Sequence, residues 1–478
     1  MRNVHGRRAP ADGQETPAAD DAADSPDDAS PPPGKGVPPR SGGPAAGLGP
    51  AGHEAAPDSR ATTAPRPPET RTRERPATYR DVFAVRAYRH LFLANVLSMT
   101  GDQLSKVALA VLVYTTTRSA TLAAATFAVT FLPWVVGGPL LSSYADLLPR
   151  RRVLVGCDLA RAVLVGALAI PHMPVPALIG ILFLATLFSP PFSSARAAMM
   201  PDLLEGDRYV VANGLDALVR QLAQVTGFLV GGAAVLLITV RGALLADVAT
   251  FLISALLILR GVPDLPAAST QKVRFNALRD TVAGVRIVFG DKVLRAYVAL
   301  FWLASAFGYA YEGIAAPFAQ ALHGGPATVG MLLAAGPLGL ALGAFLLARW
   351  VSPERRMRLI VPFAMLSMIA LIPVVAVRST GVVLVLIFLA GLGSGFSAPL
   401  NALFVRAVPA EFRGRAFGVA QAGVQALQGA AMLGAGLVVD RAGVGAGTVV
   451  GWCGIVGTVV VAGAAVLLWP RDDFHRGR

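Results

Sequence analysis

The chain has 478 residues, of which 54% are hydrophobic and 15% charged, and its mean hydropathy is +0.58. Soluble domains carry about a quarter of charged residues, so this composition indicates a membrane protein. The net charge of +13 would otherwise favour nucleic-acid binding, but so apolar a chain has little polar surface for a nucleic-acid footprint. The two cysteines, Cys157 and Cys453, lie far apart in hydrophobic segments, which excludes a disulfide scaffold and a cysteine-based metal site.

Residues 1–76 form a polar N-terminal segment. They contain 15 of the 35 prolines and almost no large apolar residue, and ten lysines and arginines nearly balance eleven acids. Such a composition cannot build a core, so we expect a disordered Pro/Ala/Gly-rich tail that acts either as a simple tether or as a docking segment. Because the tail lacks the apolar segment of a secretory signal, we expect it in the cytoplasm.

From Tyr79 onward the chain contains twelve long apolar segments. Each is near the ~20 residues that a helix needs to cross ~30 Å of hydrocarbon. The segments do not alternate polar and apolar residues as barrel strands do, so they predict an all-α membrane protein. The predicted spans are 91–115, 121–144, 153–171, 176–200, 212–238, 242–260, 296–320, 327–349, 358–377, 381–406, 415–438 and 447–469.

Basic residues in the predicted loops set the orientation. With the N-terminus inside, the inner loops contain eighteen lysines and arginines and the outer loops contain four. This bias predicts a multi-pass protein of the plasma membrane with both termini in the cytoplasm. The excess of arginine over lysine, with abundant alanine, glycine and valine, is typical of a GC-rich bacterial genome.

The longest inner loop, 261–295, separates an N-terminal half, 77–260, from a C-terminal half with a short tail, 296–478. Apolar residues recur in this loop at intervals of three and four among basic residues, which predicts an amphipathic helix. Such a helix would lie either on the inner leaflet or against the inner ends of the bundle. Its apolar residues are Phe275, Leu278, Val282, Val285 and Phe289.

The two halves share landmarks that indicate an internal repeat. Pro191 and Pro201 bracket the inner half of the fourth span, and Pro399 and Pro409 lie 208 residues later in the tenth. The turns after the second and eighth spans also share a proline followed by arginines. Transporters built from two parallel repeats bind their substrate near the membrane midplane, between the halves.

The segment Ser142-Ser143-Tyr144-Ala145-Asp146-Leu147-Leu148-Pro149-Arg150-Arg151-Arg152 resembles the loop motif between helices 2 and 3 of the major facilitator superfamily, commonly Gly-x-x-x-Asp-Arg/Lys-x-Gly-Arg-Arg. Ser142, Leu147 and Pro149 depart from that motif. Three further segments resemble the branch of enterobactin exporters and macrolide efflux proteins: Gly101-Asp102-Gln103, Asp158-Leu159-Ala160-Arg161 and Asp247-Val248-Ala249-Thr250-Phe251. The resemblance covers about residues 80–470 and implies two pseudo-symmetric six-helix halves.

Asp102 in the first span is one candidate for proton coupling. A charge at the bilayer centre costs at least ~2.5 kcal/mol, so an ionisable residue there is a functional candidate. Lys106 follows one helical turn later, where the two charges can neutralise each other. The pair is either a static anchor of helix packing or a proton carrier whose state changes as Lys106 approaches.

Glu312 in the seventh span is the second candidate for proton coupling. It occupies the symmetry-related region and has no basic residue within four positions. A buried carboxyl without a partner tends to hold a proton, which suits coupling; binding of a cationic substrate is the alternative. Arg220 in the fifth span is a candidate charge partner of either acid.

A cytoplasmic gate is predicted around the loop motif. By its resemblance to the superfamily motif, Asp146 would brace the inner gate against the start of span 11, beside Arg150, Arg151 and Arg152. Asp158 and Arg161, one turn apart near the inner end of span 3, favour a structural or gating network over a substrate role. For Asp247, placed close to the outer end of a peripheral helix, solvation or packing is a sufficient explanation.

Polar side chains on one helix face predict a cavity. Gln421, Gln425 and Gln428 recur at intervals of four and three, and a lipid-facing row of glutamines would be costly. With them, a polar but bulky cavity would be lined by Gln103, Gln221, Gln224, Asn401, Phe131, Trp134, Tyr309 and Tyr311. The stretch 227–232 partly resembles an antiporter glycine motif and predicts either close helix packing or export polarity.

These features predict a secondary active transporter, a proton-coupled exporter or antiporter of a hydrophobic or amphipathic molecule such as a siderophore, a macrolide or another natural product. An importer or facilitator of the same fold, and a transport-dead sensor, are the alternatives. The chain lacks a phosphate-binding loop of the Gly-x-x-x-x-Gly-Lys-Ser/Thr type, and its six histidines lie in the tail, loops or segment ends. We therefore expect no enzyme activity, no metal and no cofactor, with the proton gradient as the energy source. The expected partners are the substrate, protons and the lipid bilayer, with no nucleic acid, and the expected oligomeric state is a monomer.

Overall fold

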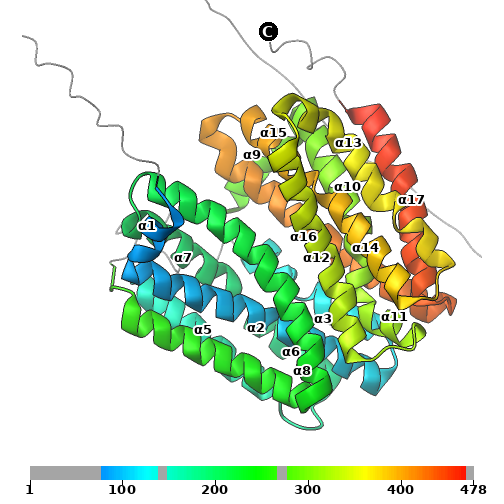
Figure 1. Ribbon diagram of the computed structural model, residues 1–478, viewed down its shortest axis with the longest axis horizontal. Coiled ribbons are helices and arrows are strands. Elements are labelled where there is room, and N and C mark those ends of the chain that lie inside the picture. The colour runs from blue at the N-terminus through cyan, green and yellow to red at the C-terminus, as the bar shows by residue number, and fades with distance from the viewer. Residues whose placement is uncertain (1–76, 138–147, 266–276, 470–478) are drawn as a thin grey trace, which may run out of the picture. The chain divides into compact units, whose positions relative to one another are not determined.

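The computed structural model describes residues 77–137, 148–265 and 277–469 (Figure 1). Contacts divide the chain into two units, Met1–Thr72 and Arg73–Arg478, and all described residues belong to the second. The predicted tail, 1–76, lies outside the described residues. Those residues form helices and no strand, which confirms the predicted all-α class.

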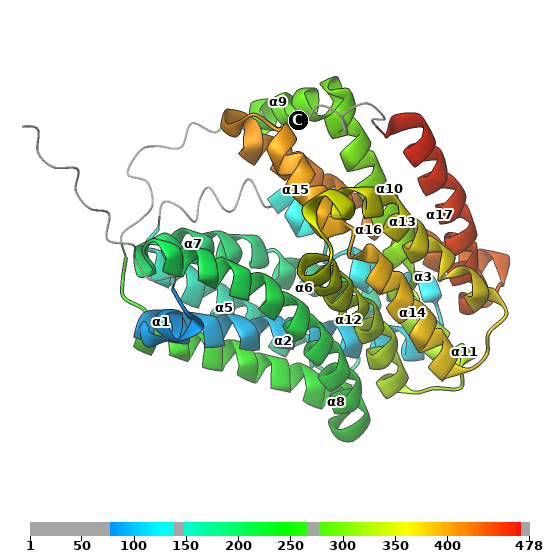
Figure 2. The same ribbon diagram turned by 45° about the horizontal axis from the view of Figure 1, so that its top comes forward.

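The N-terminal half, named here by residues 77–260, contains α2, α5 and α8 side by side (Figures 1 and 2). Its last helix, α8, has a break at Thr239, where φ is 71° and ψ is 166°, so it covers both the fifth and the sixth predicted spans. The elements of this half are α1 (Tyr79–Ala84), α2 (Arg86–Thr117), α3 (Ala120–Ala128), the π-helical turn η1 (Pro133–Gly137), α5 (Arg150–Leu168), α6 (Val175–Thr186), α7 (Ser189–Leu203) and α8 (Asp207–Gly261).

The C-terminal half begins after the amphipathic helix α9 (Ala277–Gly290), and its helices pack against one another in Figures 1 and 2. Its elements are α10 (Lys292–Gly313), α11 (Ala315–Ala321), α12 (Pro326–Trp350), α13 (Pro353–Ile369), η2 (Ile372–Val375), α14 (Thr380–Ser394), α15 (Ser397–Ala407), η3 (Ala410–Phe412), α16 (Arg413–Ala442) and α17 (Ala446–Leu468).

Within the described residues, nine helical segments are long and apolar enough to cross a membrane. One of them is α8, which the break at Thr239 divides into two. The remaining two predicted spans fall short for local reasons: the second is a shorter apolar helix, and α5 carries five charged residues among its 19. Each of the twelve predicted spans is therefore helical over most of the part that is described, as a multi-pass membrane protein requires.

The repeat is visible in two interrupted spans. The fourth breaks between Thr186 and Ser189, and the tenth breaks between Ser394 and Ser397, which lie 208 residues later. The same offset separates the prolines that indicated the repeat. Because equivalent breaks occur in both halves, the two halves have the same pattern of helices, in agreement with the predicted pseudo-symmetry.

Glycines bring helices of the two halves into backbone contact. A Cβ atom on Gly232 of α8 would lie 2.7 Å from the carbonyl oxygen of Pro326 and 3.0 Å from the Cα of Gly330 on α12. A Cβ on Gly330 would in turn lie 2.5 Å from the carbonyl oxygen of Phe228. Neither position has room for a side chain, so α8 and α12 approach as closely as small residues allow.

Asp440 near the end of α16 caps the N-terminus of α3 in the other half. Its carboxylate accepts hydrogen bonds from Ser119 Oγ at 2.6 Å, the Ala120 amide at 2.8 Å and the Thr121 amide at 2.9 Å. The first amides of a helix have no partner within the helix, and the helix dipole favours an anion there. This contact joins the halves at the end of the bundle that the predicted topology assigns to the outside.

The amphipathic helix α9 packs on the beginning of α16. A Cβ atom on Gly284 would lie 2.7 Å from the Arg415 carbonyl oxygen, and Val288 is buried. Val282, Val285 and Phe289 stay exposed and form an apolar face. Packing against the bundle is therefore observed, and contact of the exposed face with the inner leaflet stays a prediction. Phe275 and the side chain of Leu278 lie outside the described part.

Candidate functional site

A cavity of about 450 Å³ lies among the helices of the N-terminal half. This volume is within the range of ~300–1,000 Å³ that is typical of small-molecule sites. Its wall mixes apolar side chains with polar ones from α2, α5, α7 and α8. The amide and ionisable lining residues are Asn95, Asp102, Gln103, Lys106, Arg161, Arg196, Arg220 and Asp247.

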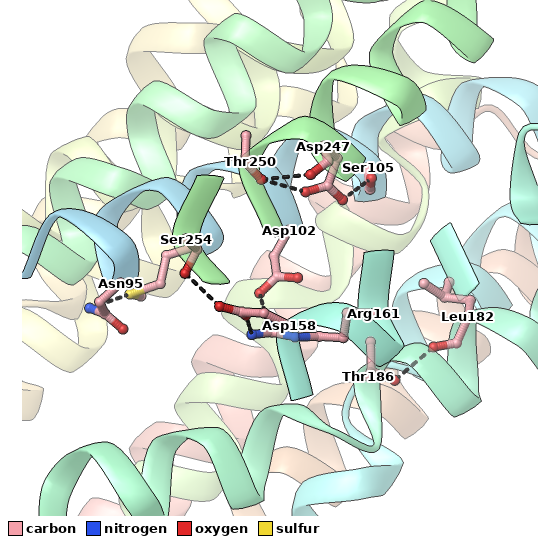
Figure 3. Close-up of polar contacts among 11 residues, drawn as sticks. Asn95, Asp102, Ser105, Asp158, Arg161, Leu182, Thr186, Asp247, Thr250 and Ser254 are labelled. Atoms are coloured by element: carbon pink, nitrogen blue, oxygen red, sulfur yellow. Dashed lines mark hydrogen bonds and ion pairs between the residues drawn. The ribbon is translucent and has the colours of Figure 1, made fainter. Parts of the chain in front are cut away.

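Arg161 is the centre of the polar cluster in this cavity (Figure 3). Its Nη2 donates to Asp158 Oδ1 at 2.5 Å, and its Nη1 donates to Asp102 Oδ2 at 3.3 Å. The guanidinium carbon also lies 4.8 Å from the ring centroid of Phe192 and 4.5 Å from that of Phe251. Because the Arg161 side chain is only 3% exposed, the two acids and the rings, rather than water, stabilise its charge.

Asp158 is fully buried beside Arg161 and also accepts a hydrogen bond from Ser254 Oγ at 2.5 Å. Removing one partner of such a pair would leave a buried charge without compensation, which is strongly destabilising. The contacts fit the structural interpretation of Asp158 and Arg161, and they add Asp102 to the network.

Asp102 pairs with Arg161 instead of Lys106, the partner expected from the sequence. Because Arg161 approaches from α5, a contact between helices replaces the pairing within α2. The Asp102 side chain is 31% exposed and lines the cavity. Lys106 lines the same cavity and lies within electrostatic range of both Asp102 and Glu312.

Glu312 is buried on α10, with 4% of its surface exposed. Its Oε1 atom has no hydrogen-bond partner among the described residues. Lys106, which belongs to the other half, acts on Glu312 electrostatically. One lysine is thus close to an acid of each half.

Asp247 is a site residue that the sequence interpretation missed. Instead of lying in a solvated position it is 0% exposed and lines the cavity. Ser105 Oγ donates to Oδ2, and Thr250 Oγ1 lies 3.1 Å from Oδ1 (Figure 3). A Cβ atom on Gly101 would collide with Asp247 and Thr250, so the glycine makes room for this carboxyl. Two sequence features could have indicated a buried position for Asp247: the glycine before Asp102 and the threonine three residues after Asp247.

A second buried ion pair, Arg196 with Asp216, joins α7 to α8 and was also missed. Arg196 and Asp216 lie in different apolar segments, and their spacing in the sequence does not indicate a contact. Arg220, expected to pair with Asp102 or Glu312, is exposed, and the acid that acts on it electrostatically is Asp216. Arg220 also lines the cavity.

The C-terminal half has its own cavity, about 280 Å³ in volume, among α10, α15 and α16. Asn401 and Gln421 line it together with four aromatic residues, Tyr297, Phe301, Phe404 and Phe417, and none of its described lining residues is Asp, Glu, Lys or Arg. The polar candidates that line a larger cavity are therefore divided between two cavities.

The other predicted cavity residues do not line one common cavity. Trp134 lines the N-terminal cavity, while Tyr309 and Tyr311 line a separate space of about 10 Å³. The remaining candidates line neither of the two larger cavities: Gln221, Gln224, Gln425, Gln428 and Phe131.

The predicted gate arginines hold N-terminal helices together at the end that the predicted topology assigns to the inside. Arg150 Nη1 donates to the Ala198 carbonyl oxygen at 2.6 Å and pairs with Asp202. Arg151 Nη1 donates to the Val262 carbonyl oxygen at 3.3 Å, whereas Arg152 is exposed. These contacts connect α5 to α7 and to the residue after α8. Asp146, with its predicted contact to span 11, lies outside the described residues.

The glycine segment of α8 packs against α2. A Cβ on Gly227 would lie 2.7 Å from the Thr100 carbonyl oxygen, and one on Gly231 would lie 3.0 Å from the Leu104 Cα. The contacts agree with the helix-packing interpretation of this segment.

Comparison with known families identifies the fold. The family model of the Major Facilitator Superfamily matches residues 91–431, with a second match over 304–478. A curated relative, the uncharacterized MFS-type transporter YfmI of Bacillus subtilis (strain 168), is 27% identical over 158 residues. That match covers 33% of this chain and 39% of the relative's length.

Solved transporters share this fold. The nucleoside transporter NupG superposes with a TM-score of 0.61 at 15% identity, over 79% of this chain and 98% of NupG. A POT family transporter in complex with a thioalcohol-conjugated peptide gives 0.61 at 14% identity, over 79% and 96%. A bacterial homologue of the human lysosomal transporter Spinster, in an inward-facing and unoccupied conformation, gives 0.61 at 13% identity, over 80% and 96%.

Proposed function

Because the chain belongs to the Major Facilitator Superfamily, we propose that it is a proton-coupled exporter of a hydrophobic or amphipathic small molecule. Its family and its apolar helices make it a multi-pass membrane protein with a transporter fold. The three segments around Asp102, Asp158 and Asp247 support a place in the branch of enterobactin exporters and macrolide efflux proteins. The loop charges support a plasma-membrane location with both termini inside.

Transport by alternating access fits the division into two halves. The halves would rock around the bound molecule and open it to one side at a time. The volume of the N-terminal cavity suits a small molecule, and the aromatic residues of the smaller C-terminal cavity suit a hydrophobic body. Export is supported by the branch resemblance and by the partial antiporter motif in α8.

One lysine near two acids of different halves carries the coupling proposal. Lys106 and Asp102 are on the same helix, so their separation changes little, whereas Glu312 is on α10 in the other half. Rocking of the halves changes the distance from Lys106 to Glu312. A nearby lysine stabilises ionised Glu312, and its departure leaves a buried carboxyl that takes up a proton. Proton binding at Glu312 would thus follow the conformation.

Everted membrane vesicles test this proposal. Respiration acidifies the vesicle lumen, and a fluorescent amine reports the pH gradient after addition of erythromycin or of a catecholate siderophore. We expect at least one of the two compounds to discharge the gradient when the wild-type protein is present, and we expect Glu312→Gln to abolish the discharge. Arg441→Gln, which changes an exposed charge at the outer end of α16, is the matched control.

Two results would contradict the proposal. Export of the compound that is unaffected by collapse of the gradient would indicate a facilitator. A discharge that persists in Glu312→Gln would remove this acid from the coupling mechanism.

A further inference from the structure

Arg220 is a cation on the wall of the N-terminal cavity that has no ion pair among the described residues. It lies in the fifth predicted span and lines the cavity, and it makes neither a hydrogen bond nor an ion pair with the part of the chain that the structure describes. An ionisable residue inside a membrane span normally pairs with another group, so one whose donors stay free indicates a function. The N–H groups of its guanidinium are available to a molecule in the cavity.

The position of Arg220 on α8 places it on the interior face of that helix. Asp216, Ala223 and Gly227 lie around it at successive intervals of four, three and four residues, and all three are buried. Residues at these intervals share one face of a helix. Gly227 on this face packs against α2. The exposed surface of Arg220 therefore belongs to the cavity rather than to the lipid side of the bundle.

The charges around this cavity balance in number but not in place. The charged lining residues and their ion-pair partners are four acids and four bases: Asp102, Asp158, Asp216 and Asp247, with Lys106, Arg161, Arg196 and Arg220. On one side, Arg161 and Lys106 lie within electrostatic range of three of these acids and of Glu312 in the other half. Negative charge is in excess on that side, so the excess of bases lies elsewhere on the wall.

Arg196 and Arg220 form the base-rich side, and they share one acid. Asp216 pairs with Arg196 and acts electrostatically on Arg220, so this side has one positive charge in excess. Arg196 is 8% exposed, and its Nε has no hydrogen-bond partner among the described residues. Ser189 and Ser193 of α7 line the same cavity, and their hydroxyl groups also lack a partner in the described part of the chain. All of these groups can donate to an anion.

We propose that this side of the cavity binds an anionic group of the transported molecule, with Arg220 as its main anchor. The planar fork of a guanidinium donates two parallel hydrogen bonds to a carboxylate or to a similar anion with two adjacent oxygens. The substrate class is thereby narrowed to hydrophobic molecules that carry such an acidic group, in preference to basic amines. This substrate class rests on the proposed transport function, whereas binding of the anion does not.

Calorimetric titration of the purified full-length protein tests the site. The probes are 1-naphthoate, 1-naphthamide and 1-naphthylmethylamine, which share one apolar body and are anionic, neutral and cationic at neutral pH. We expect naphthoate to bind most tightly. Arg220→Gln should weaken naphthoate binding by about ten-fold or more, as loss of a charge-assisted pair does, and should change naphthamide binding far less. Arg220→Lys, which keeps the charge without the fork, should recover part of the loss.

The matched control is Arg208→Gln, which removes an exposed positive charge from the same helix outside the cavity lining. It should leave all three affinities unchanged. Because Arg220 has no partner among the described residues to lose, we expect the same melting temperature for Arg220→Gln as for wild type. Naphthoate binding that is no tighter than naphthamide binding in wild type, or that is equal in wild type and Arg220→Gln, overturns the inference.

Vesicle transport separates this inference from the proposed function. The catecholate siderophore is acidic and erythromycin is a basic amine, so we expect the siderophore to discharge the gradient and Arg220→Gln to reduce that discharge. Discharge by erythromycin alone would support the proposed function and contradict this substrate class. If neither compound causes discharge while naphthoate binding still depends on Arg220, the proposed function and the substrate class fail and the anion site stands.

Discussion

The two halves share a pattern of helices but differ in the chemistry of their interiors. Among the described residues, five buried charged side chains lie in the N-terminal half, and Glu312 alone lies in the C-terminal half. The N-terminal cavity contains arginines, a lysine and acids, whereas the C-terminal cavity is aromatic with two amides. The repeat thus preserves helix breaks and close crossings while the interior side chains differ.

This difference predicts that the change in stability on altering a buried charge differs between the two halves. Arg161 and the acids around it are buried together, so each depends on its partners, and removing one leaves a charge with no compensation. Replacing Glu312 should cost less stability, because one of its oxygens is already without a partner among the described residues. We expect the N-terminal half to be the sensitive one when charges are changed, and the variants below test that expectation.

Arg161→Met should have the largest effect. It leaves Asp158 and Asp102 without their cation, and the expected loss in free energy of unfolding is about 3–5 kcal/mol. Denaturation of the purified protein in mild detergent measures the loss. The double variant Arg161→Met/Asp158→Asn should recover part of it, since one uncompensated acid is then removed. Unchanged stability of the single variant would mean that the network contributes little.

Gly101→Ala should rank second. A methyl group at this position collides with Asp247 and Thr250, and overpacking of this kind costs about 1–3 kcal/mol. The matched control is Gly180→Ala in α6, where an added Cβ meets no atom within 4 Å. The control should be neutral or slightly stabilising, because alanine has the higher helix propensity. Equal stability of the two variants would contradict the close approach of α2 and α8.

Asp440→Asn tests the contact between halves rather than either interior. The neutral amide keeps some capping but loses the charge at the α3 N-terminus, with an expected cost of about 0.5–1 kcal/mol. A cysteine at Thr121, in a protein with Cys157 and Cys453 replaced by alanine, should react faster with an external maleimide. Arg441→Gln controls for surface charge, and an unchanged labelling rate would show that the contact does not hold the outer ends together.

Glu312→Gln should have the smallest effect on stability, within about 1 kcal/mol, because a neutral amide replaces a carboxyl that lacks a partner at one oxygen. Its effect on gradient discharge should nevertheless be complete. A loss of stability as large as that of Arg161→Met would show that the two halves depend equally on their buried charges.

The sequence predicts the helices because their signal is local. Apolar length predicts the twelve spans, and the first prolines of the two pairs that indicate the repeat lie just after the breaks in the fourth and tenth spans. Five of the candidate residues, which were proposed for coupling, charge pairing, the gate or the cavity, line one cavity: Asp102, Gln103, Lys106, Arg161 and Arg220. Their role in transport stays a prediction.

The pairing of these residues could not be predicted from one helix at a time. The i,i+4 spacing favoured Lys106 as the partner of Asp102, but Arg161 reaches it from a helix that starts 33 residues after α2 ends. The burial of Asp247 depends on the face that α8 turns toward α2 and on the space left at Gly101. The position of Asp247 relative to a helix end reveals neither this face of α8 nor the space at Gly101.

The glycine crossing of α8 and α12 has a mechanical consequence. Where Gly232 meets Gly330, the two halves touch without side chains between them. The angle between α8 and α12 can therefore change without any side chain at the crossing changing its rotamer. Such a crossing can act as a hinge that keeps the halves in register while their far ends separate. A bulky residue at either position would act as a wedge and fix one angle between the halves.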